Sequence, residues 1–267
     1  MNPKRALTIA GSDCSGGAGL QADLKTFQER DVYGMTVVTV TVAMVPETWS
    51  HIVKPLSVET IKEQFATIVE GIGADAIKTG MLPTVEIIDT VGALLAKSNC
   101  PHIVIDPVMV CKGTSEPLFP ENTEAMKRSL LPIAEVVTPN TFEAAQLAGM
   151  DDIKSKDDIL AAAEAIHKLG PKYVLIKAAR IFPDKAMDVL YDGKQCTIKE
   201  NPRINTTWTH GAGCSFSACV TAELAKGASV EDAAATATAF VNAGLRESFP
   251  YNKFTGPIYH KAFAKGL

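Results

Sequence analysis

Apolar runs of strand length alternate along this chain with amphipathic stretches of helix length. Residues 7–10 form the first apolar run, residues 20–30 form a helix-length stretch after it, and the alternation continues to an apolar run at 173–177. Strands that alternate with helices predict a mostly parallel sheet that is covered by helices on both faces. We therefore expect an α/β fold, in which ligands bind at the carboxyl ends of the strands.

The expected elements follow from hydrophobic periodicity and from turn residues. Late in the chain, Asp192-Gly193 between two apolar runs predicts an antiparallel hairpin over 187–198. Residues 44–51 are expected to form a polar, aromatic loop. The other predicted strands are 7–10, 35–44, 75–79, 102–106, 135–138 and 173–177, and the predicted helices are 20–30, 57–71, 85–97, 141–148, 155–169, 213–226 and 230–247.

Length and composition limit the class of protein. A chain of 267 residues without a recognisable linker or repeat fits a single domain over 1–267, large enough to need no metal or disulfide to stabilise its core. Thirty acidic and 26 basic residues give a net charge of −4 without a basic run, so we expect no nucleic-acid partner. The six cysteines form no CxxC pair and no metal-ligand spacing. We therefore expect free thiols, most of them small core residues.

Neither a membrane span nor a signal peptide is expected. The sequence contains no apolar stretch of the roughly 18 residues that a spanning helix needs. The apolar run after Lys4 and Arg5 covers only 6–10, and charge returns at Asp13, so this run is too short for a signal peptide. These features predict a cytoplasmic protein, in which thiols stay reduced.

A glycine-rich segment, GSDCSGGAG at 11–19, joins the first strand to the first helix. Residues 17–22 fit the loose dinucleotide fingerprint G-x-G-x-x-A, but the second strand ends at Met44 without the acidic residue that would hold a ribose. Nicotinamide binding is therefore excluded. The segment is either a tight turn, in which glycines supply positive φ, or a set of N–H donors for a ligand. Asp23, one helical turn after Gly19, either complements the helix dipole or contacts a ligand.

The segment THGAGCS at 209–215 leads directly into a long Ala-rich helix. Its backbone N–H groups can converge on one anion, as the transfer of a γ-phosphoryl group requires, or the segment is an ordinary loop. The sequence has no G-x-x-x-x-G-K-[ST] motif, which excludes a Walker-type nucleotide site. At the start of this helix the pKa of Cys214 should fall. We interpret His210 as a structural hydrogen-bonding residue.

Two further segments end predicted strands with side chains that suit a cation. Asn140 followed by Glu143 is typical of a capping box; alternatively, the Glu143 carboxylate positions Mg²⁺ while Asn140 lies near a phosphate. Asp106 stands at the end of the fourth strand, where it either binds a cation or starts a turn before Pro107. Met81, at the end of the third strand, is expected to form pocket wall.

Taken in order, these segments resemble the ribokinase superfamily, and within it the branch of hydroxymethylpyrimidine kinases and bacterial pyridoxal kinases. The resemblance covers nearly the whole chain. It implies a three-layer α/β/α sandwich, usually a homodimer, that transfers the γ-phosphoryl group of ATP to a hydroxymethyl group. The matching motifs are AGSD at 10–13, GAG with QADLKT at 17–26, KTGM at 78–81, DPVM at 106–109, TPN with a following Glu at 138–143, and HGAGC at 210–214.

The resemblance also implies roles for individual residues. The anion hole corresponds to Gly211, Ala212, Gly213 and Cys214. The positions implied for ATP are Asn140, Glu143, Gly213 and Lys177, although KAAR at 177–180 departs from the usual Lys-Gly-Gly; those implied for Mg²⁺ are Asp106 and Glu143. The implied substrate-binding positions are Ser12, Gly19, Asp23, Met44, His51, Met81 and Val108.

Two departures decide the expected substrate, the first from the pyrimidine kinases and the second from most ribokinase relatives. Met44-Val45 stands where those enzymes carry Gln-Asn, and that Gln binds the pyrimidine. Cys214 replaces the Asp base of most ribokinase relatives, and together with Cys111 it resembles a group of pyridoxal kinases that capture the substrate aldehyde on a thiol. Whether Cys214 attacks the aldehyde or assists proton removal stays open.

The resemblance thus implies ATP- and Mg²⁺-dependent phosphorylation of the 5′-hydroxymethyl group of pyridoxal, extending to pyridoxine and pyridoxamine. Phosphorylation of hydroxymethylpyrimidine or its phosphate is the alternative within enzymes. A non-catalytic ligand-binding protein on the same fold is the alternative from another class.

Overall fold

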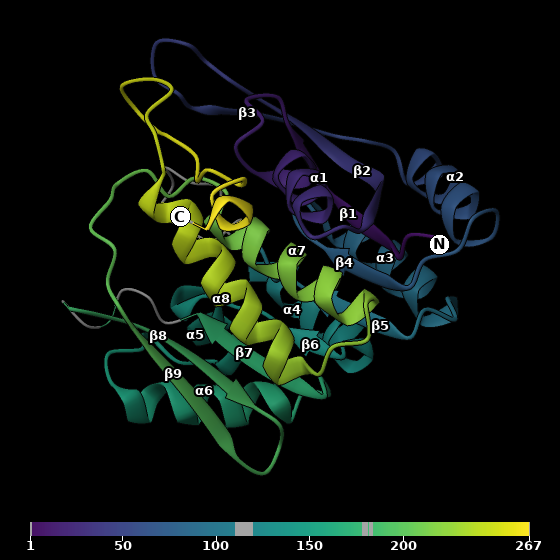
Figure 1. Ribbon diagram of the computed structural model, residues 1–267. Helices are drawn as coiled ribbons and strands as arrows, with labels where there is room; N and C mark the ends of the chain where they lie inside the picture. Colours follow the sequence, from purple (N-terminus) through teal and green to yellow (C-terminus); the bar gives the residue numbers. More distant parts are fainter. Residues whose placement is uncertain (1, 110–119, 178–180, 182–183, 267) are drawn as a thin grey trace.

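The computed structural model describes residues 2–109, 120–177, 181 and 184–266. Within these residues one nine-stranded sheet forms, with the strand order β3-β2-β1-β4-β5-β6-β7-β8-β9 (Figure 1). Its strands are β1 (Arg5–Asp13), β2 (Tyr33–Met44), β3 (His51–Pro55), β4 (Ala76–Thr79), β5 (His102–Ile105), β6 (Val136–Val137), β7 (Tyr173–Lys177), β8 (Lys185–Tyr191) and β9 (Cys196–Pro202). The helices are α1 (Gly19–Glu29), α2 (Val58–Val69), α3 (Val85–Lys97), α4 (Pro120–Ser129), α5 (Thr141–Ala148), α6 (Lys156–His167), α7 (Ala212–Ala225) and α8 (Val230–Arg246), with short 3₁₀ turns at Leu131–Ile133 and Phe263–Lys265.

The sheet is mostly parallel, as the alternating pattern predicts. Its five central pairings, from β2-β1 to β6-β7, are parallel. Antiparallel pairs occur at its two edges, where β3 pairs with β2 and the β8-β9 hairpin pairs with β7. Gly193, with φ of 90°, lies in the turn of that hairpin, which confirms the hairpin expected from Asp192-Gly193.

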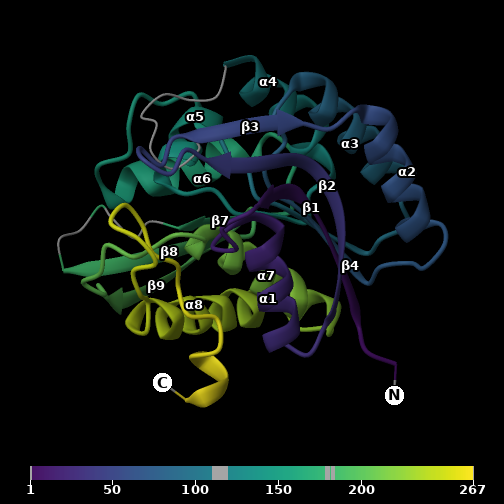
Figure 2. The same ribbon diagram turned by 90° about the horizontal axis from the view of Figure 1, so that it is seen from above.

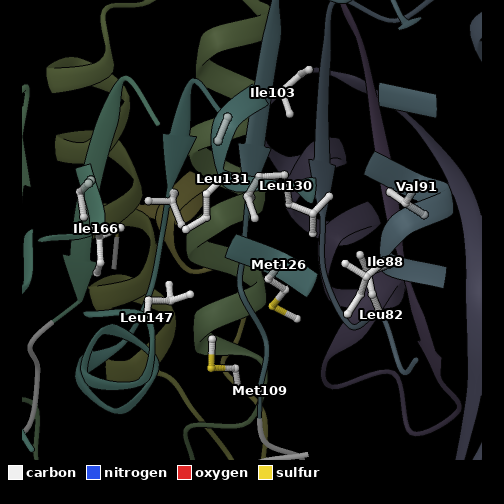
Figure 3. Close-up of a cluster of buried hydrophobic side chains, with 14 of the residues drawn as sticks. Leu82, Ile88, Val91, Ile103, Met109, Met126, Leu130, Leu131, Leu147 and Ile166 are labelled. Carbon is white, nitrogen blue, oxygen red and sulfur yellow. The ribbon is translucent and has the colours of Figure 1, made fainter. Parts of the chain in front are cut away.

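Helices cover both faces of the sheet, so the fold is the expected three-layer sandwich. Helices α1, α7 and α8 lie on one face, and α2 to α6 lie on the other (Figures 1 and 2). The larger core cluster packs the second group of helices on the sheet through residues such as Ile88, Met126 and Ile103 (Figure 3). On the opposite face, Phe216 of α7 and Phe240 of α8 pack against Val104 of the sheet. Apolar side chains on both faces of the central strands explain their continuous apolar runs.

Two elements differ from the sequence-based expectations. Residues 51–55, expected as part of or just after a loop, form the edge strand β3, which pairs with β2 so that His51 lies opposite Met44. This strand is mostly exposed, so it lacks the buried apolar run that marks the central strands. Helix α4 is also additional: apart from Ala125 and Met126 it is polar, which gives little helical periodicity to detect.

The described cysteines are free thiols, as predicted. Cys219 is buried, but Cys14 is exposed, so the expectation of a core position is wrong for Cys14. None of the helices among the described residues is both long enough and apolar enough to cross a membrane.

Candidate active site

The candidate site lies at the carboxyl edge of the parallel strands. Asp106 follows the last residue of β5, and Lys177 is the last residue of β7. Ser217, in the second turn of α7, donates a hydrogen bond from its Oγ to Asp106 Oδ2 at 3.0 Å. The start of α7 therefore lies over the ends of β5 and β7, and the segments predicted to carry the chemistry meet at this edge.

The glycine-rich loop after β1 is fastened to the segment before α7. Asp13 accepts hydrogen bonds from the backbone N–H groups of Ser15 (2.8 Å) and Ala18 (3.0 Å), and His210 Nε2 lies 2.8 Å from Asp13 Oδ2. Burial would raise the pKa of Asp13, but the contacts with His210 and Ser15 hold it below its usual value. A Cβ placed on Gly17 would overlap the His210 ring. These contacts confirm the structural interpretation of His210.

Cys214 lies in the first turn of α7, and its sulfur lies near the Gly19 N–H at the start of α1. Burial raises the pKa of the Cys214 thiol to about 12, and the negative charges of Asp23 and Asp106 add to this effect. The prediction that its pKa falls is therefore wrong. Two carboxylates and the loss of water outweigh the helix dipole and the nearby Lys78 ammonium.

Asp106 is held by three side chains. Its Oδ1 accepts from Lys177 Nζ at 3.2 Å and from Thr138 Oγ1 at 3.3 Å, and its Oδ2 accepts from Ser217. Burial alone would lower the pKa of Lys177, but the Asp106 carboxylate raises it, so Lys177 stays a cation. A Cβ on Gly213 would lie 3.7 Å from Lys177 Nζ. The ammonium group is therefore beside the first turn of α7, where an anion would bind.

Asn140 and Glu143 form the capping box that their spacing predicts. Asn140 Oδ1 accepts from the Glu143 N–H at 2.9 Å, and Glu143 Oε2 accepts from the Asn140 N–H at 2.8 Å. Besides capping the helix, Glu143 is buried beside charged groups. Burial raises its pKa to about 7, with Lys177 opposing this shift and Asp106 adding to it. Glu143 and Asp106 are thus neighbouring carboxylates.

Asp23 lies in the protein interior rather than on a pocket surface. Its side chain and that of Lys78 are both fully buried; Lys78 Nζ donates to Asp23 Oδ2 at 2.9 Å and Thr8 Oγ1 donates to it at 2.6 Å. The expectation that Asp23 contacts the substrate directly is therefore corrected, because no part of its side chain reaches the surface. This ion pair was not predicted from the sequence, although a lysine in the short apolar strand β4 is the signal that could have indicated it.

The β2-β3 hairpin carries two of the predicted substrate-binding residues. Met44 and His51 are half-buried and pair directly across the hairpin. Burial and the nearby His210 lower the pKa of His51, so its ring is neutral at pH 7. The loop between them packs on the C-terminal segment, with the Trp49 and Phe254 rings stacked 6.3 Å apart. The hairpin is thus held over the same edge as the glycine-rich loop.

The remaining predicted residues occupy several positions at this edge. Met81 is half-buried and its carbonyl oxygen accepts from Thr39 Oγ1 at 2.7 Å; Val108 is half-buried, and its N–H donates to the Asp106 carbonyl oxygen. A pocket of about 410 Å³ lies nearby, and Ser12 is the one predicted site residue among those that line it. The pocket is lined by Ser12, Cys14, Thr41, Val42, Ala43, Ile52 and Lys54.

Two of the predicted site residues, Ala212 and Cys111, need separate mention. The Ala212 N–H donates to the Thr209 carbonyl oxygen at 3.2 Å, so it belongs to the turn before α7 and does not point freely at a ligand. Cys111 lies outside the described residues. Among the residues that are described, no three His, Cys, Asp or Glu side chains gather as metal ligands.

The fold and this edge define a ribokinase-like α/β protein, and the comparisons with known proteins narrow the class. The profile of the phosphomethylpyrimidine kinase family matches residues 13–259. The chain belongs to this family, and it is a kinase.

Relatives within the family differ in how closely they match. The pyridoxine kinase of Bacillus subtilis is 54% identical over 264 residues, which cover 98% of this chain and 97% of the relative. The hydroxymethylpyrimidine/phosphomethylpyrimidine kinase of the same organism is 40% identical over 266 residues, 99% of this chain and 97% of the relative.

A solved structure matches closely as well. The pyridoxal kinase from Staphylococcus aureus in complex with AMP-PCP and pyridoxal superposes with a TM-score of 0.93 at 45% identity, covering 98% of this chain and 95% of the other. That protein therefore holds AMP-PCP and pyridoxal on the same fold.

Proposed function

We propose that the chain is a pyridoxal kinase, which transfers the γ-phosphoryl group of ATP to the 5′-hydroxymethyl group of pyridoxal and also accepts pyridoxine and pyridoxamine. The observation that carries this proposal is the Cys214 thiol, which lies at the start of α7 near the Asp106–Lys177 pair. A thiol can add to the aldehyde of pyridoxal, whereas hydroxymethylpyrimidine has no aldehyde. The names of the pyridoxine and pyridoxal kinase relatives support the same substrate class.

Phosphoryl transfer needs chiefly positioning and charge neutralisation. The first N–H groups of a helix have no acceptor within the helix, so Gly211, Gly213 and Cys214 are the proposed donors to the transferring phosphoryl group. Lys177 would add a positive charge beside Gly213, and Asn140 would lie near the phosphates of ATP. In this proposal the site places the nucleotide and the alcohol in line and supplies no covalent chemistry to the phosphoryl group.

Asp106 and Glu143 are the residues that would hold Mg²⁺ or its waters. Their chemistry fits the ion, because Mg²⁺ takes one or two carboxylates and completes its coordination with water and phosphate oxygens. The raised pKa of Glu143, about 7, reflects burial and crowding with a second carboxylate that a cation would relieve. When bound, the ion would neutralise the charge of the phosphate oxygens.

Cys214 has two possible roles in this proposal: its thiol adds to the aldehyde, or it assists proton removal from the 5′-hydroxyl group. Burial raises the pKa of this thiol to about 12, and both roles require the thiol to give up its proton. In the capture step the sulfur forms a bond to the aldehyde carbon, the C=O double bond opens, and the thiol proton ends on the former carbonyl oxygen. The product is a hemithioacetal. Cys111 is proposed to close over the pocket.

The decisive experiment is an assay of ADP release coupled to an indicator reaction, with pyridoxal, pyridoxine and hydroxymethylpyrimidine as substrates. We expect turnover of pyridoxal, and turnover of the pyrimidine alone would overturn the proposal. Cys214→Ala should strongly reduce pyridoxal turnover, whereas Cys219→Ala, a buried thiol later in the same helix, serves as the matched control. Ligand binding without any ADP release would instead indicate a non-catalytic binding protein.

We further propose that residues 1–267 form one kinase domain that acts as a cytoplasmic homodimer without a nucleic-acid partner. The family resemblance supports the dimer, and the net charge of −4 without a basic run disfavours nucleic acid. Light scattering coupled to size exclusion measures the mass in solution, and a monomeric mass would contradict the dimer.

A further inference from the structure

Tyr251, in the C-terminal segment that follows α8, contacts three separate segments of the candidate site. Its hydroxyl group lies 2.9 Å from Ser15 Oγ in the glycine-rich loop. Its ring lies edge-on to the His210 ring, with centroids 6.4 Å apart, and packs at 5.8 Å on Trp49 in the turn between β2 and β3. In both views the C-terminal segment runs beside that turn (Figures 1 and 2). One side chain therefore joins segments that are far apart in the sequence.

Backbone hydrogen bonds fasten the segment that carries Tyr251 to the residues just before α7. The His210 N–H donates to the Gly256 carbonyl oxygen at 3.0 Å, and the Ile258 N–H donates to the His210 carbonyl oxygen at 3.3 Å, so the two segments pair like neighbouring strands. The Tyr251 N–H donates to the Thr255 carbonyl oxygen at 3.4 Å. Tyr251 is thus fixed relative to the start of α7, where the transferring phosphoryl group is proposed to bind.

The backbone of Trp49 indicates that its ring is held in place. Trp49 has φ of 59°, in the left-handed region that a bulky side chain rarely adopts. Such a conformation persists only where the surrounding structure enforces it. The ring packs on Tyr251 and stacks on Phe254 with an interplanar angle of 19°, and the Trp49 N–H donates to the Val45 carbonyl oxygen at 2.7 Å. The turn is therefore held against the C-terminal segment in a strained conformation.

Both segments that Tyr251 holds away from α7 belong to the substrate side of the proposed site. The turn with Trp49 joins Met44 to His51, which pair directly across the hairpin and are implied substrate-binding positions. The Ser15 contact acts on the glycine-rich loop at 11–19, which carries two further implied positions. The contacts of Tyr251 thus connect the substrate side of the site to its phosphate side.

We propose that Tyr251 positions the acceptor substrate for phosphoryl transfer, by holding the β2–β3 hairpin and the glycine-rich loop in place relative to the start of α7. The hydroxymethyl group of the substrate has to meet the phosphoryl group in line, so the two sides of the site need a rigid connection. Tyr251 is a positioning residue, since it acts through Trp49, Ser15 and His210. The inference rests on the substrate and phosphate sides assigned in the proposed function.

The first test compares acceptor kinetics with nucleotide binding. An aromatic pair contributes roughly 2- to 10-fold to an equilibrium constant, so Tyr251→Ala should lower kcat/KM for pyridoxal on the order of 10-fold. Calorimetry should show an unchanged Kd for ADP, a split that general loosening of the fold would not cause. Tyr251→Phe keeps the ring contacts and loses only the bond to Ser15, so it should recover most of the loss. Phe249→Ala removes an exposed ring of the same segment that packs on Tyr259, and this matched control should react like the unaltered protein.

Three results of this comparison would overturn the proposal. The first is an unchanged kcat/KM in Tyr251→Ala. The second is a loss of ADP affinity as large as the loss of kcat/KM, because Tyr251 would then support the whole site and not the acceptor substrate. The third is an equal loss in Phe249→Ala, because any change in the C-terminal segment would then have the same effect.

Trp49→Gly covers the case in which Tyr251→Ala does not fold. Glycine adopts a positive φ without strain, so this change removes the ring contacts while it relieves the backbone. We again expect kcat/KM for pyridoxal to fall on the order of 10-fold, with an unchanged Kd for ADP. An unchanged kcat/KM, or an equal loss of ADP affinity, overturns the proposal here as well.

The fluorescence of Trp49 follows the turn without any substrate. The chain contains two tryptophans, so Trp208→Phe leaves Trp49 as the single probe. Adding Tyr251→Ala to that protein should introduce a fast local component into the decay of the Trp49 anisotropy, because the turn is released. An unchanged decay would show that Tyr251 does not hold the turn, and the proposal would fail.

Failure of the proposed substrate has a different result. If hydroxymethylpyrimidine and not pyridoxal is the acceptor, the unaltered protein does not turn over pyridoxal, and the same variants are compared on the pyrimidine. Slower turnover of the pyrimidine by Tyr251→Ala, with unchanged ADP binding, then supports the role of Tyr251 although the proposed substrate is wrong. An equal rate removes the role of Tyr251 as well.

Discussion

One added methyl group at Gly211 should reduce catalysis by more than its effect on stability explains. Gly211 is the N-cap of α7, with φ of 77°, and a Cβ there would overlap the carbonyl oxygen of Gly17 and lie 3.3 Å from the Cα of Ala18. Gly211→Ala therefore has two effects. It places a side chain in the left-handed region, and it forces the glycine-rich loop away from the start of α7.

Gly149 provides the control for the first effect. It caps α5 with φ of 69°, and a Cβ on it meets nothing within 4 Å. A left-handed alanine costs roughly 1–2 kcal/mol. In a domain of this size, 1 kcal/mol lowers Tm by about 2 °C. Gly149→Ala should therefore lower Tm by about 2–4 °C and leave kcat/KM unchanged.

The second effect belongs to Gly211 alone. Gly17 and Gly211 meet through backbone atoms, so no side-chain rotation relieves the overlap and the two segments must move apart by about 1 Å. A misplacement of this size costs about 100-fold in rate. We expect Gly211→Ala to lose about 100-fold in kcat/KM for pyridoxal, with a larger fall in Tm than Gly149→Ala. The assays are coupled ADP release and thermal unfolding followed by circular dichroism. If Gly211→Ala keeps kcat/KM within about threefold of the unaltered protein, the contact between these segments does not position the anion site and the reasoning is refuted.

Three further predictions concern charge and substrate choice. The pKa of Glu143 rises from its usual 4.5 to about 7 on folding, so the folded state holds a proton that the unfolded chain has lost, and stability falls as pH rises across that window. Glu143→Gln, which retains the capping acceptor, should flatten this fall in urea unfolding, and an unchanged slope would contradict it. Lys177→Met should weaken ADP binding about 10- to 100-fold in calorimetry, because a charged hydrogen bond is worth about 1.5–3 kcal/mol; Lys199→Met is the control, and equal losses in both variants would refute a specific role. Met44→Gln with Val45→Asn should raise the turnover of hydroxymethylpyrimidine relative to pyridoxal, and an unchanged ratio would show that this pair does not select the substrate.

The sequence predicts the central fold well because the relevant signals are local. Apart from β2, whose residues alternate between buried and partly exposed, the parallel strands are largely buried on both faces and form short apolar runs. Helix α3 and strand β7 have the bounds that periodicity predicts. Strand β3 and helix α4 escape detection because their stability comes from neighbouring elements and not from their own pattern. An edge strand such as β3 is recognised only when its partner is in place.

The same contrast between local and long-range contacts applies to the candidate site. The Asn140–Glu143 capping box is a contact between residues three apart, so spacing alone reveals it. The pKa of Cys214 depends on Asp23 and Asp106, which are far from it in sequence. The local signal, a cysteine at a helix start, predicts a shift in the opposite direction. Lys78 is hidden for the same reason, because a lysine within a strand does not reveal which carboxylate it meets.

Lys177 and Lys78 lie at different depths and pair with different carboxylates. Lys177 pairs with Asp106 beside Gly213, where a phosphate would replace part of its interaction with the carboxylate, so this cation is available to an incoming anion. Lys78 is fully buried against Asp23 and cannot reach a bound phosphate. Its charge therefore serves the interior of the protein, where it opposes the effect of burial on the pKa of Asp23. In the proposed mechanism the Lys177–Asp106 pair would act on the nucleotide, whereas the Lys78–Asp23 pair joins β4 to α1 inside the fold.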